Sequence, residues 1–171
     1  MIPRHIHQIF YNIGKGELNS ISAFRDGLIK TQSYCKEKQI KHTLWSEEDC
    51  LQLLEDYKEY RELYDSFCQP IMKIDFMRLL ILHKYGGIYI DLDVHPINDI
   101  TPLFDRDAFF VHWHDDTKKT PYNAILGTEP HTDLYKSIIA HCKESYYEKR
   151  SMPIYKTWTG RLVYQTTGHH M

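Results

Sequence analysis

The sequence predicts an α/β fold: a Rossmann-like domain with a mainly parallel central sheet and helices on both faces. Three observations lead to this prediction. Short segments rich in β-branched and aromatic residues alternate with longer segments that have helical spacing. One helical segment is apolar on almost every side, as is typical of a helix buried within a layer. The length of 171 residues suits one hydrophobic core, so we expect a single domain over residues 1–171.

In the first part of the chain the expected elements alternate between strand and helix. β-branched and aromatic residues predict the strands, and the helical spacing of apolar residues predicts the helices. Ser46 is expected to cap the second helix, whose first turn carries acidic residues that suit the positive end of the helix dipole. In order, these elements are a strand at 2–10, a helix at 20–38, a strand at 41–45 and a helix from 46 to about Tyr60.

The centre of the chain contains the apolar helix, residues 74–85, and the strand that follows it. Gly86-Gly87 ends the helix, because glycine tolerates the left-handed backbone of a helix C-cap. The next segment, IYIDLDV at 88–94, is expected to be a central strand. Side chains alternate along a strand, so one face should anchor the sheet and the other should face a ligand. The anchoring residues are expected to be Ile88, Ile90 and Leu92.

Two carboxylates, Asp91 and Asp93, close this strand, at the end of the sheet where open α/β folds bind their ligands. By alternation they should share a face with Tyr89. Two like charges in a partly buried site require a cation, and hard oxygen ligands favour Mg²⁺ or Mn²⁺. Such ions accept substrate phosphates, so one or two protein carboxylates suffice. The pattern predicts a metal site, although an isolated D-x-D more often consists of solvated turn acids.

A second pair of charges lies in the apolar helix. Asp75 and Arg78 are three residues apart, so they share a face of the helix. One interpretation is an ion pair that orders the helix. The other is a pair that addresses a polar ligand, with Asp75 accepting from hydroxyls and Arg78 donating to a phosphate or a sugar oxygen. The sequence leaves both interpretations open.

The remainder of the chain is expected to contain two strands and an amphipathic helix, and then a segment without a recognisable closing element. Residues 157–171, TWTGRLVYQTTGHHM, end abruptly, so either the chain is unusually compact or its natural C-terminus is missing. The expected elements are strands at 108–113 and 122–126 and a helix at 131–149, with Leu134, Ile138, Ile139 and Cys142 facing inward.

Composition excludes some partners. The net charge is -2 and the 21 basic residues are scattered, so no nucleic-acid partner is expected. The four cysteines have no C-x-x-C spacing, which indicates reduced thiols and a cytoplasmic location. No apolar run approaches the roughly 18 residues of a spanning helix, so no transmembrane segment is expected. Peripheral contact with a membrane stays open.

Residues 75–94, DFMRLLILHKYGGIYIDLDV, resemble the signature of a family of DXD-motif sugar transferases. This family includes initiating α-1,6-mannosyltransferases, inositol-phosphoceramide mannosyltransferases and capsular polysaccharide transferases. Its usual form is S-D-x-x-R, an apolar helix, and Y-G-G-x-Y-x-D-x-D. The opening IPRHIHQIF, Leu44-Trp45 and Asn123 also match family positions. Ile74 stands where serine is usual, and Phe10 stands where tryptophan is common.

This resemblance implies a nucleotide-sugar-binding domain of the GT-A type that acts as a glycosyltransferase in polysaccharide biosynthesis. The implied reaction moves a hexose, with retention, from a UDP- or GDP-linked donor to a glycan, a lipid-linked acceptor or another hydroxyl, with Mn²⁺ or Mg²⁺. Asp93 would ligate the metal directly, and Asp91 would contact the donor and the metal through water. His169 or His170 would complete the metal shell. The implied catalytic and donor-binding residues are Asp91, Asp93, Arg78, Asp75, Tyr89, His7, Gln8 and Asn123.

Two other functions stay open. Asp91-Leu92-Asp93 is similar to the D-x-D-x-T motif of phosphohydrolases with an aspartate nucleophile, but His95 occupies the threonine position. A non-catalytic sugar-binding module would use some of the 13 tyrosines and 3 tryptophans to stack on sugar rings. A metal-dependent reaction on a nucleotide sugar separates the transferase from both.

Overall fold

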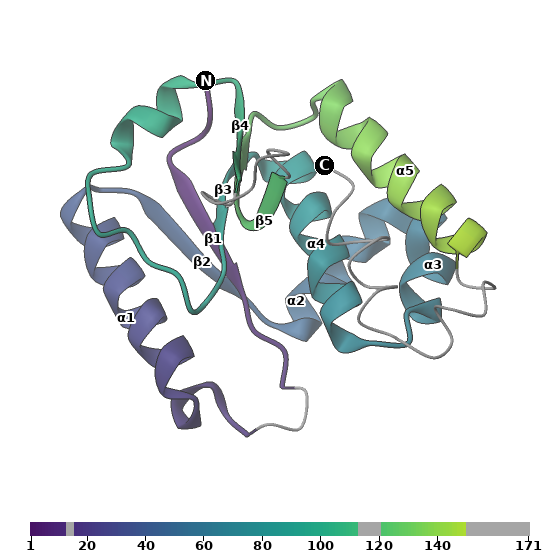
Figure 1. Ribbon diagram of the computed structural model, residues 1–171, viewed down its shortest axis with the longest axis horizontal. Helices are drawn as coiled ribbons and strands as arrows, with labels where there is room; N and C mark the ends of the chain where they lie inside the picture. The colour runs from purple at the N-terminus through teal and green to yellow at the C-terminus, as the bar shows by residue number, and fades with distance from the viewer. Residues whose placement is uncertain (13–15, 113–120, 150–171) are drawn as a thin grey trace.

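A sheet lies between two groups of helices in the computed structural model, which describes residues 1–12, 16–112 and 121–149. The strands are β1 (His5–Ile9), β2 (Lys41–Trp45), β3 (Gly87–Ile90), β4 (Ala108–His112) and β5 (Pro121–Thr128). The helices are α1 (Ser22–Glu37), α2 (Glu47–Leu54), α3 (Arg61–Ser66), α4 (Pro70–Tyr85) and α5 (Asp133–Lys149), and the 3-10 helices are η1 (Leu18–Ser20), η2 (Glu55–Tyr60) and η3 (Thr101–Asp105). Helix α1 covers one face, and α2 to α5 lie on the other (Figure 1). The expected α/β fold with helices on both faces is confirmed.

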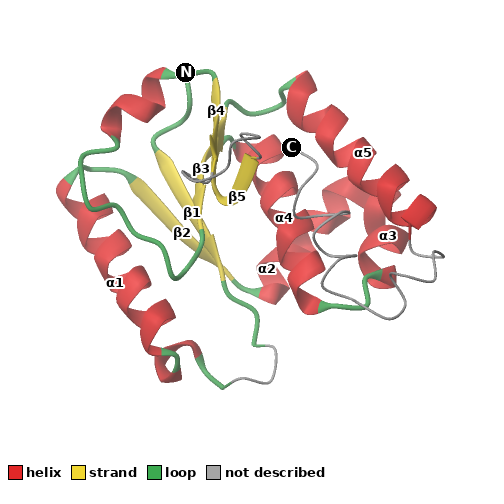
Figure 2. Ribbon diagram, in the orientation of Figure 1, coloured by secondary structure: helices red, strands yellow, loops and turns green. Residues whose placement is uncertain are grey.

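Within the described residues the sheet has five strands in the order β2-β1-β3-β5-β4, with β3 in the centre as expected (Figure 2). Strand β1 runs parallel to β2 and β3, whereas β5 runs antiparallel to both β3 and β4. Four strands therefore share one direction and β5 opposes them. Only residues 113–120 join β4 to β5. A parallel crossover needs about a dozen residues or more, which explains why the sheet is mixed.

Each face of the sheet has its own apolar core. The core under α1 and η3 includes Ile6, Cys35, Ile88, Ile90 and Phe104. The larger core lies between the sheet and α2 to α5, and the apolar helix α4 is at its centre. A helix enclosed in this way is apolar on most sides, which agrees with its sequence. The carboxyl ends of β1 and β3 emerge together between the two cores (Figure 1).

The helix after Ser46 ends earlier than expected. Ser46 and Asp49 form the capping box: the Ser46 hydroxyl accepts from the Asp49 amide at 3.1 Å, and the Asp49 carboxylate accepts from the Ser46 amide at 2.9 Å. The α-helix stops at Leu54, and Tyr57 has non-helical backbone angles. This kink turns Tyr57 inward, where its hydroxyl hydrogen-bonds Nδ1 of His83 in α4 at 2.6 Å. The tertiary contact therefore overrides the helical spacing.

Helix α4 begins at Pro70 rather than at residue 74, because proline is well suited to the first turn of a helix. Gly86 ends it, as expected, with a φ of 62°, and Gly87 follows with a φ of 98°. In the described residues, no helix combines the length and the apolar character that crossing a membrane requires.

Helix α5 buries three of the four residues expected to face inward, Ile138, Ile139 and Cys142. Leu134 was expected to face inward, but it is 46% exposed. Tyr135 takes its place, so that the buried stripe follows the spacing i, i+3, i+4, i+7. The stripe consists of Tyr135, Ile138, Ile139 and Cys142.

A fully buried histidine, His7, joins β1 to its neighbours. Its Nδ1 accepts from the Trp45 indole N–H at 3.1 Å, so the neutral ring carries its proton on Nε2 and donates it to the Gly86 carbonyl at 2.9 Å. Burial first, and then the nearby His5, lower the pKa of His7 from 6.5 to about 3. Protonation at Nδ1 would also break the hydrogen bond from Trp45.

We predict that this histidine makes the protein sensitive to acid. Below pH 6.5 the unfolded chain takes up a proton that the folded protein excludes, so the free energy of unfolding falls as pH falls from about 6.5 towards 3. The slope from one such group is about 1.4 kcal/mol per pH unit. Urea melts at pH 7, 6 and 5 measure it. In His7→Gln the free energy of unfolding should depend less steeply on pH, by the amount that corresponds to the uptake of about one proton on unfolding. An unchanged dependence on pH would contradict the assignment.

Candidate functional site

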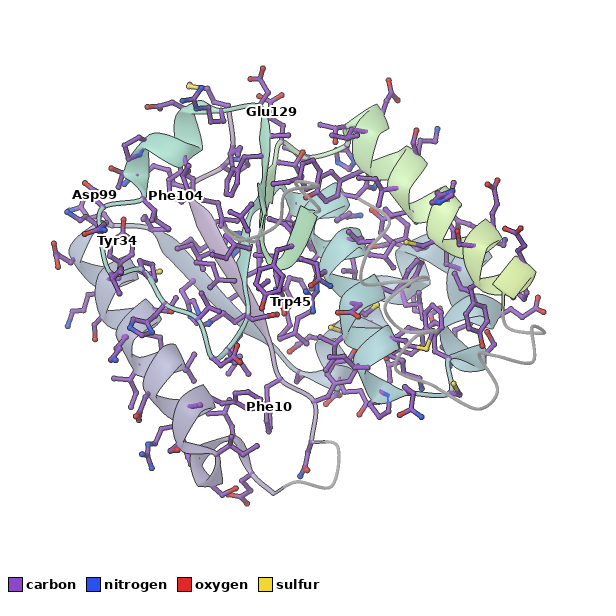
Figure 3. All side chains as sticks on the ribbon, viewed as in Figure 1. Phe10, Tyr34, Trp45, Asp99, Phe104 and Glu129 are labelled. Atoms are coloured by element: carbon purple, nitrogen blue, oxygen red, sulfur yellow. The ribbon has the colours of Figure 1, made fainter. Side chains whose placement is uncertain are left out.

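A cavity of about 210 Å³ opens at the carboxyl ends of β1 and β3. One wall is apolar and comes from the end of β1 and the starts of α1 and α4. The other wall is charged and comes from α4 and the end of β3. The lining residues are Ile9, Phe10, Tyr11, Gly16, Ile21, Phe24, Ile71, Ile74, Arg78, Tyr89, Asp91, Leu92 and Asp93. Figure 3 labels Phe10, on the segment that leaves β1. Open α/β sheets bind ligands at this end.

Both predicted acids line the cavity, but a turn brings them there rather than the pleat of a strand. Strand β3 ends at Ile90, and residues Asp91–Val94 form the acidic turn, which is closed by a 3.0 Å bond from the Val94 amide to the Asp91 carbonyl. Leu92 also lines the cavity, so the predicted alternation, which placed Leu92 on the opposite face, is wrong after Ile90. Asp93 is exposed, and the Asp91 side chain is 29% exposed.

Arg78 is the buried cation of the site, with a side chain only 3% exposed. Its guanidinium contacts Asp75 at 2.6 Å and Asp91 at 3.4 Å, and it lies over the Tyr89 ring at 4.6 Å. It also donates to the Asn123 carbonyl at 2.5 Å. Burial would lower the pKa of Arg78, but the surrounding phenol and carboxylates raise it above its usual value, so the group stays charged.

One nitrogen of this guanidinium remains unused. Nε of Arg78 is buried and has no hydrogen-bond partner among the described residues. A buried donor without a partner costs free energy, and Arg78 lines the cavity, so this residue is a candidate contact for a ligand. The geometry therefore supports the ion-pair interpretation for both residues and the ligand interpretation for Arg78 alone, because Arg78 lines the cavity and Asp75 does not.

Asp75 and Asn123 lie behind Arg78 and do not line the described cavity. The Asp75 side chain is 5% exposed, and its Oδ1 accepts from the Asn123 amide at 3.3 Å. Their described contacts hold Arg78 in place through its NH1 and NH2 groups. We therefore assign them a supporting position in the site.

Tyr89 orients Asp91. Its hydroxyl donates to Oδ1 of Asp91 at 2.8 Å, and the ring is buried beside Arg78. Burial, together with the nearby Asp91, raises the pKa of Tyr89 well above its usual value, although the Arg78 charge opposes this. The phenol therefore keeps its proton, and the Tyr89 hydroxyl remains a hydrogen-bond donor to Asp91.

His7 and Gln8, expected among the donor-binding residues, point away from the cavity. His7 is occupied by Trp45 and Gly86, as described above. Gln8 is buried; its amide N–H donates to the Asp91 carbonyl at 3.3 Å, and its Oε1 accepts from His42 at 3.0 Å. Gln8 thus supports the backbone of the acidic turn rather than contacting the cavity.

The donor set suits a hard divalent cation that shares its ligands with a substrate. The described hydrogen bond and ion pair of the Asp91 carboxylate both use Oδ1. Asp93 is exposed at the cavity. No group of three or more His, Cys, Asp or Glu side chains in the described parts of the chain could hold a metal. Two carboxylates are enough for Mg²⁺ or Mn²⁺ when phosphate oxygens complete the shell. His169 and His170 lie outside the described residues.

The apolar wall was not predicted from the sequence. On α4, Ile71 and Ile74 precede Arg78 at helical spacing, so this part of the wall could have been inferred from the position of Arg78. Ile21 and Phe24, at the start of α1, carry no local signal. Only the packing of α1 beside the acidic turn brings them to the cavity.

Comparison with known proteins identifies the family of this chain. Residues 24–110, which are 87 of the 171 residues, match a family described as a glycosyltransferase sugar-binding region containing a DXD motif. Inositol phosphoceramide mannosyltransferase 1 of Schizosaccharomyces pombe is 28% identical over 142 residues, which are 80% of this chain and 42% of that protein. Inositol phosphoceramide mannosyltransferase 3 of the same yeast is 37% identical over 111 residues, which are 63% of this chain and 29% of that protein. The chain spans less than half the length of these relatives.

A solved structure of the PaToxG glycosyltransferase has a TM-score of 0.61 at 13% identity, and the match covers 98% of this chain and 66% of that one. This likeness confirms the expected fold. The resemblance inferred from residues 75–94 is confirmed as well. Because the family match covers just over half of the chain and includes both Arg78 and the acidic turn, the chain belongs to the glycosyltransferase family whose sugar-binding region contains a DXD motif.

Proposed function

We propose that residues 1–171 act as the catalytic domain of a metal-dependent glycosyltransferase. It would move a hexose from a UDP- or GDP-linked donor to a hydroxyl of a glycan or lipid-linked acceptor. The observation that carries this proposal is that two carboxylates and a buried arginine line the same cavity as a set of apolar side chains. This arrangement suits a ligand with a charged diphosphate and a less polar remainder. Since the two relatives are named mannosyltransferases, mannose is the first hexose to test.

The charged wall would bind the diphosphate of the donor. Asp93 would hold Mn²⁺ or Mg²⁺ directly and Asp91 through water, and the bound ion would neutralise charge on the departing diphosphate. The guanidinium of Arg78 would donate to a diphosphate oxygen, and its charge would stabilise the same leaving group. Tyr89 keeps Asp91 in one orientation during this step.

The apolar wall would limit the access of water. Its side chains include Phe10, Phe24 and Ile74. Excluding water favours transfer to an acceptor hydroxyl over hydrolysis of the donor. The same wall would contact the less polar part of the nucleotide. We also propose a cytoplasmic location, which the free thiols of the four cysteines support.

Retention of the anomeric configuration is part of the proposal. Among the described residues, the carboxylates that line the cavity are those of Asp91 and Asp93, which we assign to the metal. We therefore propose a front-face route: the bond from the anomeric carbon to the diphosphate oxygen breaks, and the acceptor oxygen bonds to that carbon from the same side. The acceptor proton passes to the diphosphate oxygen that leaves.

A thermal-shift screen with UDP- and GDP-sugars tests the proposal without an acceptor. A ligand that binds only the folded protein raises the melting temperature, and at a hundred times its Kd it adds about 2.7 kcal/mol. We expect a shift for one nucleotide class in the presence of Mn²⁺, and loss of that shift with EDTA. Chromatography should then show slow donor cleavage.

Three results would contradict this function. One is the absence of a shift with every nucleotide sugar. Another is binding of free sugars without cleavage of any donor, which indicates a sugar-binding module. The third is a phosphoenzyme trapped on Asp91, which indicates a phosphohydrolase.

A further inference from the structure

Gly27 of helix α1 lies against the backbone of the acidic turn. This residue is buried in the middle of the helix. A Cβ atom placed on it would lie far inside contact distance of the Leu92 carbonyl oxygen, 3.0 Å from the Leu92 carbonyl carbon and 3.4 Å from Cα of Asp93. The hydrogen that glycine has in that place points at the carbonyl oxygen, as in a Cα–H···O contact. No residue with a side chain fits here unless the helix or the turn moves.

The same helix contributes directly to the cavity. Phe24, one turn before Gly27, and Ile21 at the start of the helix both line it. A change in the distance between α1 and the acidic turn would therefore move two lining residues relative to the carboxylates. Glycine is a poor residue for a helix interior, so the close approach supplies the physical reason for it at this position.

A second contact ties α1 to the segment that follows the turn. The Tyr34 hydroxyl donates to Asp99 at 3.0 Å and accepts from the Ile100 amide at 2.9 Å. Figure 3 shows Tyr34 and Asp99 side by side near the end of α1. Residues 91–100 thus meet the helix at both ends of the segment, at Gly27 and at Tyr34. Helix α1 therefore contacts this segment directly at two places.

We infer that Gly27 is a positioning residue for the proposed donor site: it sets the approach of α1 and thereby the placement of Asp91 and Asp93. This inference rests on the proposed function for its chemical meaning. The backbone contact itself is independent of that function. An added methyl group should shift the turn away from the helix, so that the two carboxylates no longer share a ligand in the original geometry.

The test compares two glycine-to-alanine variants. In Gly27→Ala the methyl group meets the acidic turn. In the matched control Gly127→Ala, a methyl on β5 would lie 2.7 Å from Cδ1 of Phe109, away from the cavity. Both should lower the melting temperature. Only Gly27→Ala should weaken Mn²⁺ binding measured by electron paramagnetic resonance with UDP or GDP present, by about tenfold or more.

Hydrogen exchange supplies a readout that needs no ligand. The Asp91 amide donates a hydrogen bond to the Ala124 carbonyl, and the Val94 amide donates one to the Asp91 carbonyl. In Gly27→Ala, the peptide containing residues 91–94 should exchange faster, whereas in Gly127→Ala the faster exchange should lie in β4 and β5. If Mn²⁺ affinity and exchange at the turn are the same in Gly27→Ala as in the unsubstituted protein, the inference is wrong. If the unsubstituted protein binds neither nucleotide with Mn²⁺, the proposed function fails instead.

The added methyl group can also prevent folding, so the unsubstituted protein provides a second test. On addition of Mn²⁺ with UDP or GDP, the amides of residues 27–31 should gain protection together with those of 91–94. A turn that gains protection while this part of α1 stays unchanged would overturn the inference.

Discussion

Replacing Asp93 by asparagine is expected to reduce Mn²⁺-dependent cleavage of the donor by about a thousandfold or more, without loss of stability. Asp93 is the exposed acid of the turn, so its removal leaves no buried partner behind. An amide keeps the shape of the side chain but removes the negative charge that a divalent cation needs. The steady-state rate with the donor found in the thermal screen measures the effect.

Asp107→Asn is the matched control for this substitution. Asp107 is an aspartate before β4 whose side chain is 92% exposed, and it is not part of the cavity lining. Its replacement should leave the rate unchanged. Two results would contradict the proposed role of the metal. One is a rate for Asp93→Asn within a few-fold of the rate of the unsubstituted protein, and the other is a rate that EDTA does not affect.

Replacing Arg78 by alanine is expected to abolish donor binding and to lower the free energy of unfolding by about 3–5 kcal/mol. The guanidinium is almost completely buried, and its loss would leave the Asp75 carboxylate without its 2.6 Å partner. It would also remove the donor to the Asn123 carbonyl. Urea unfolding measures the stability, and calorimetry with Mn²⁺ and the nucleotide measures binding.

Arg78→Lys separates the two roles of this residue. Lysine keeps the positive charge beside Asp75 but lacks the planar fork that contacts several oxygens at once. We expect it to recover part of the stability and to bind the nucleotide at least about tenfold more weakly. Full binding in Arg78→Lys would show that the ion pair is purely structural. Arg61→Ala, which breaks an exposed ion pair with Asp65, should change neither quantity.

Much of the fold follows from local features of the sequence. The alternation of strand and helix, the cap at Ser46 and the end of α4 at Gly86 rest on residues close together in the chain, and all three are confirmed. The ends of elements that depend on distant contacts were less predictable. The helix is interrupted at Tyr57, whose hydroxyl hydrogen-bonds His83, 26 residues further along the chain.

In the candidate site, too, the residues predicted correctly are those that depend on short spacings in the sequence. Asp75 and Arg78 share a helix face because of their spacing, and the acids of the turn follow β3 directly, so the sequence alone identified them. His7 was also singled out, although its side chain lies away from the cavity. A buried polar residue on a strand and a ligand-binding one look alike until their partners are known.

Composition and short spacings in the sequence predict the family, the strands and most of the helices, and the charged residues at the carboxyl end of β3. The tertiary structure adds that a turn presents the two acids and that Tyr89 and Gln8 hydrogen-bond to Asp91 in this turn. It also shows that α1 can approach the turn closely because residue 27 is glycine. The contacts of Gln8 and Gly27 join residues more than 60 positions apart. Such contacts follow from the packing of α1 and β1 against the end of β3, and no local pattern encodes that packing.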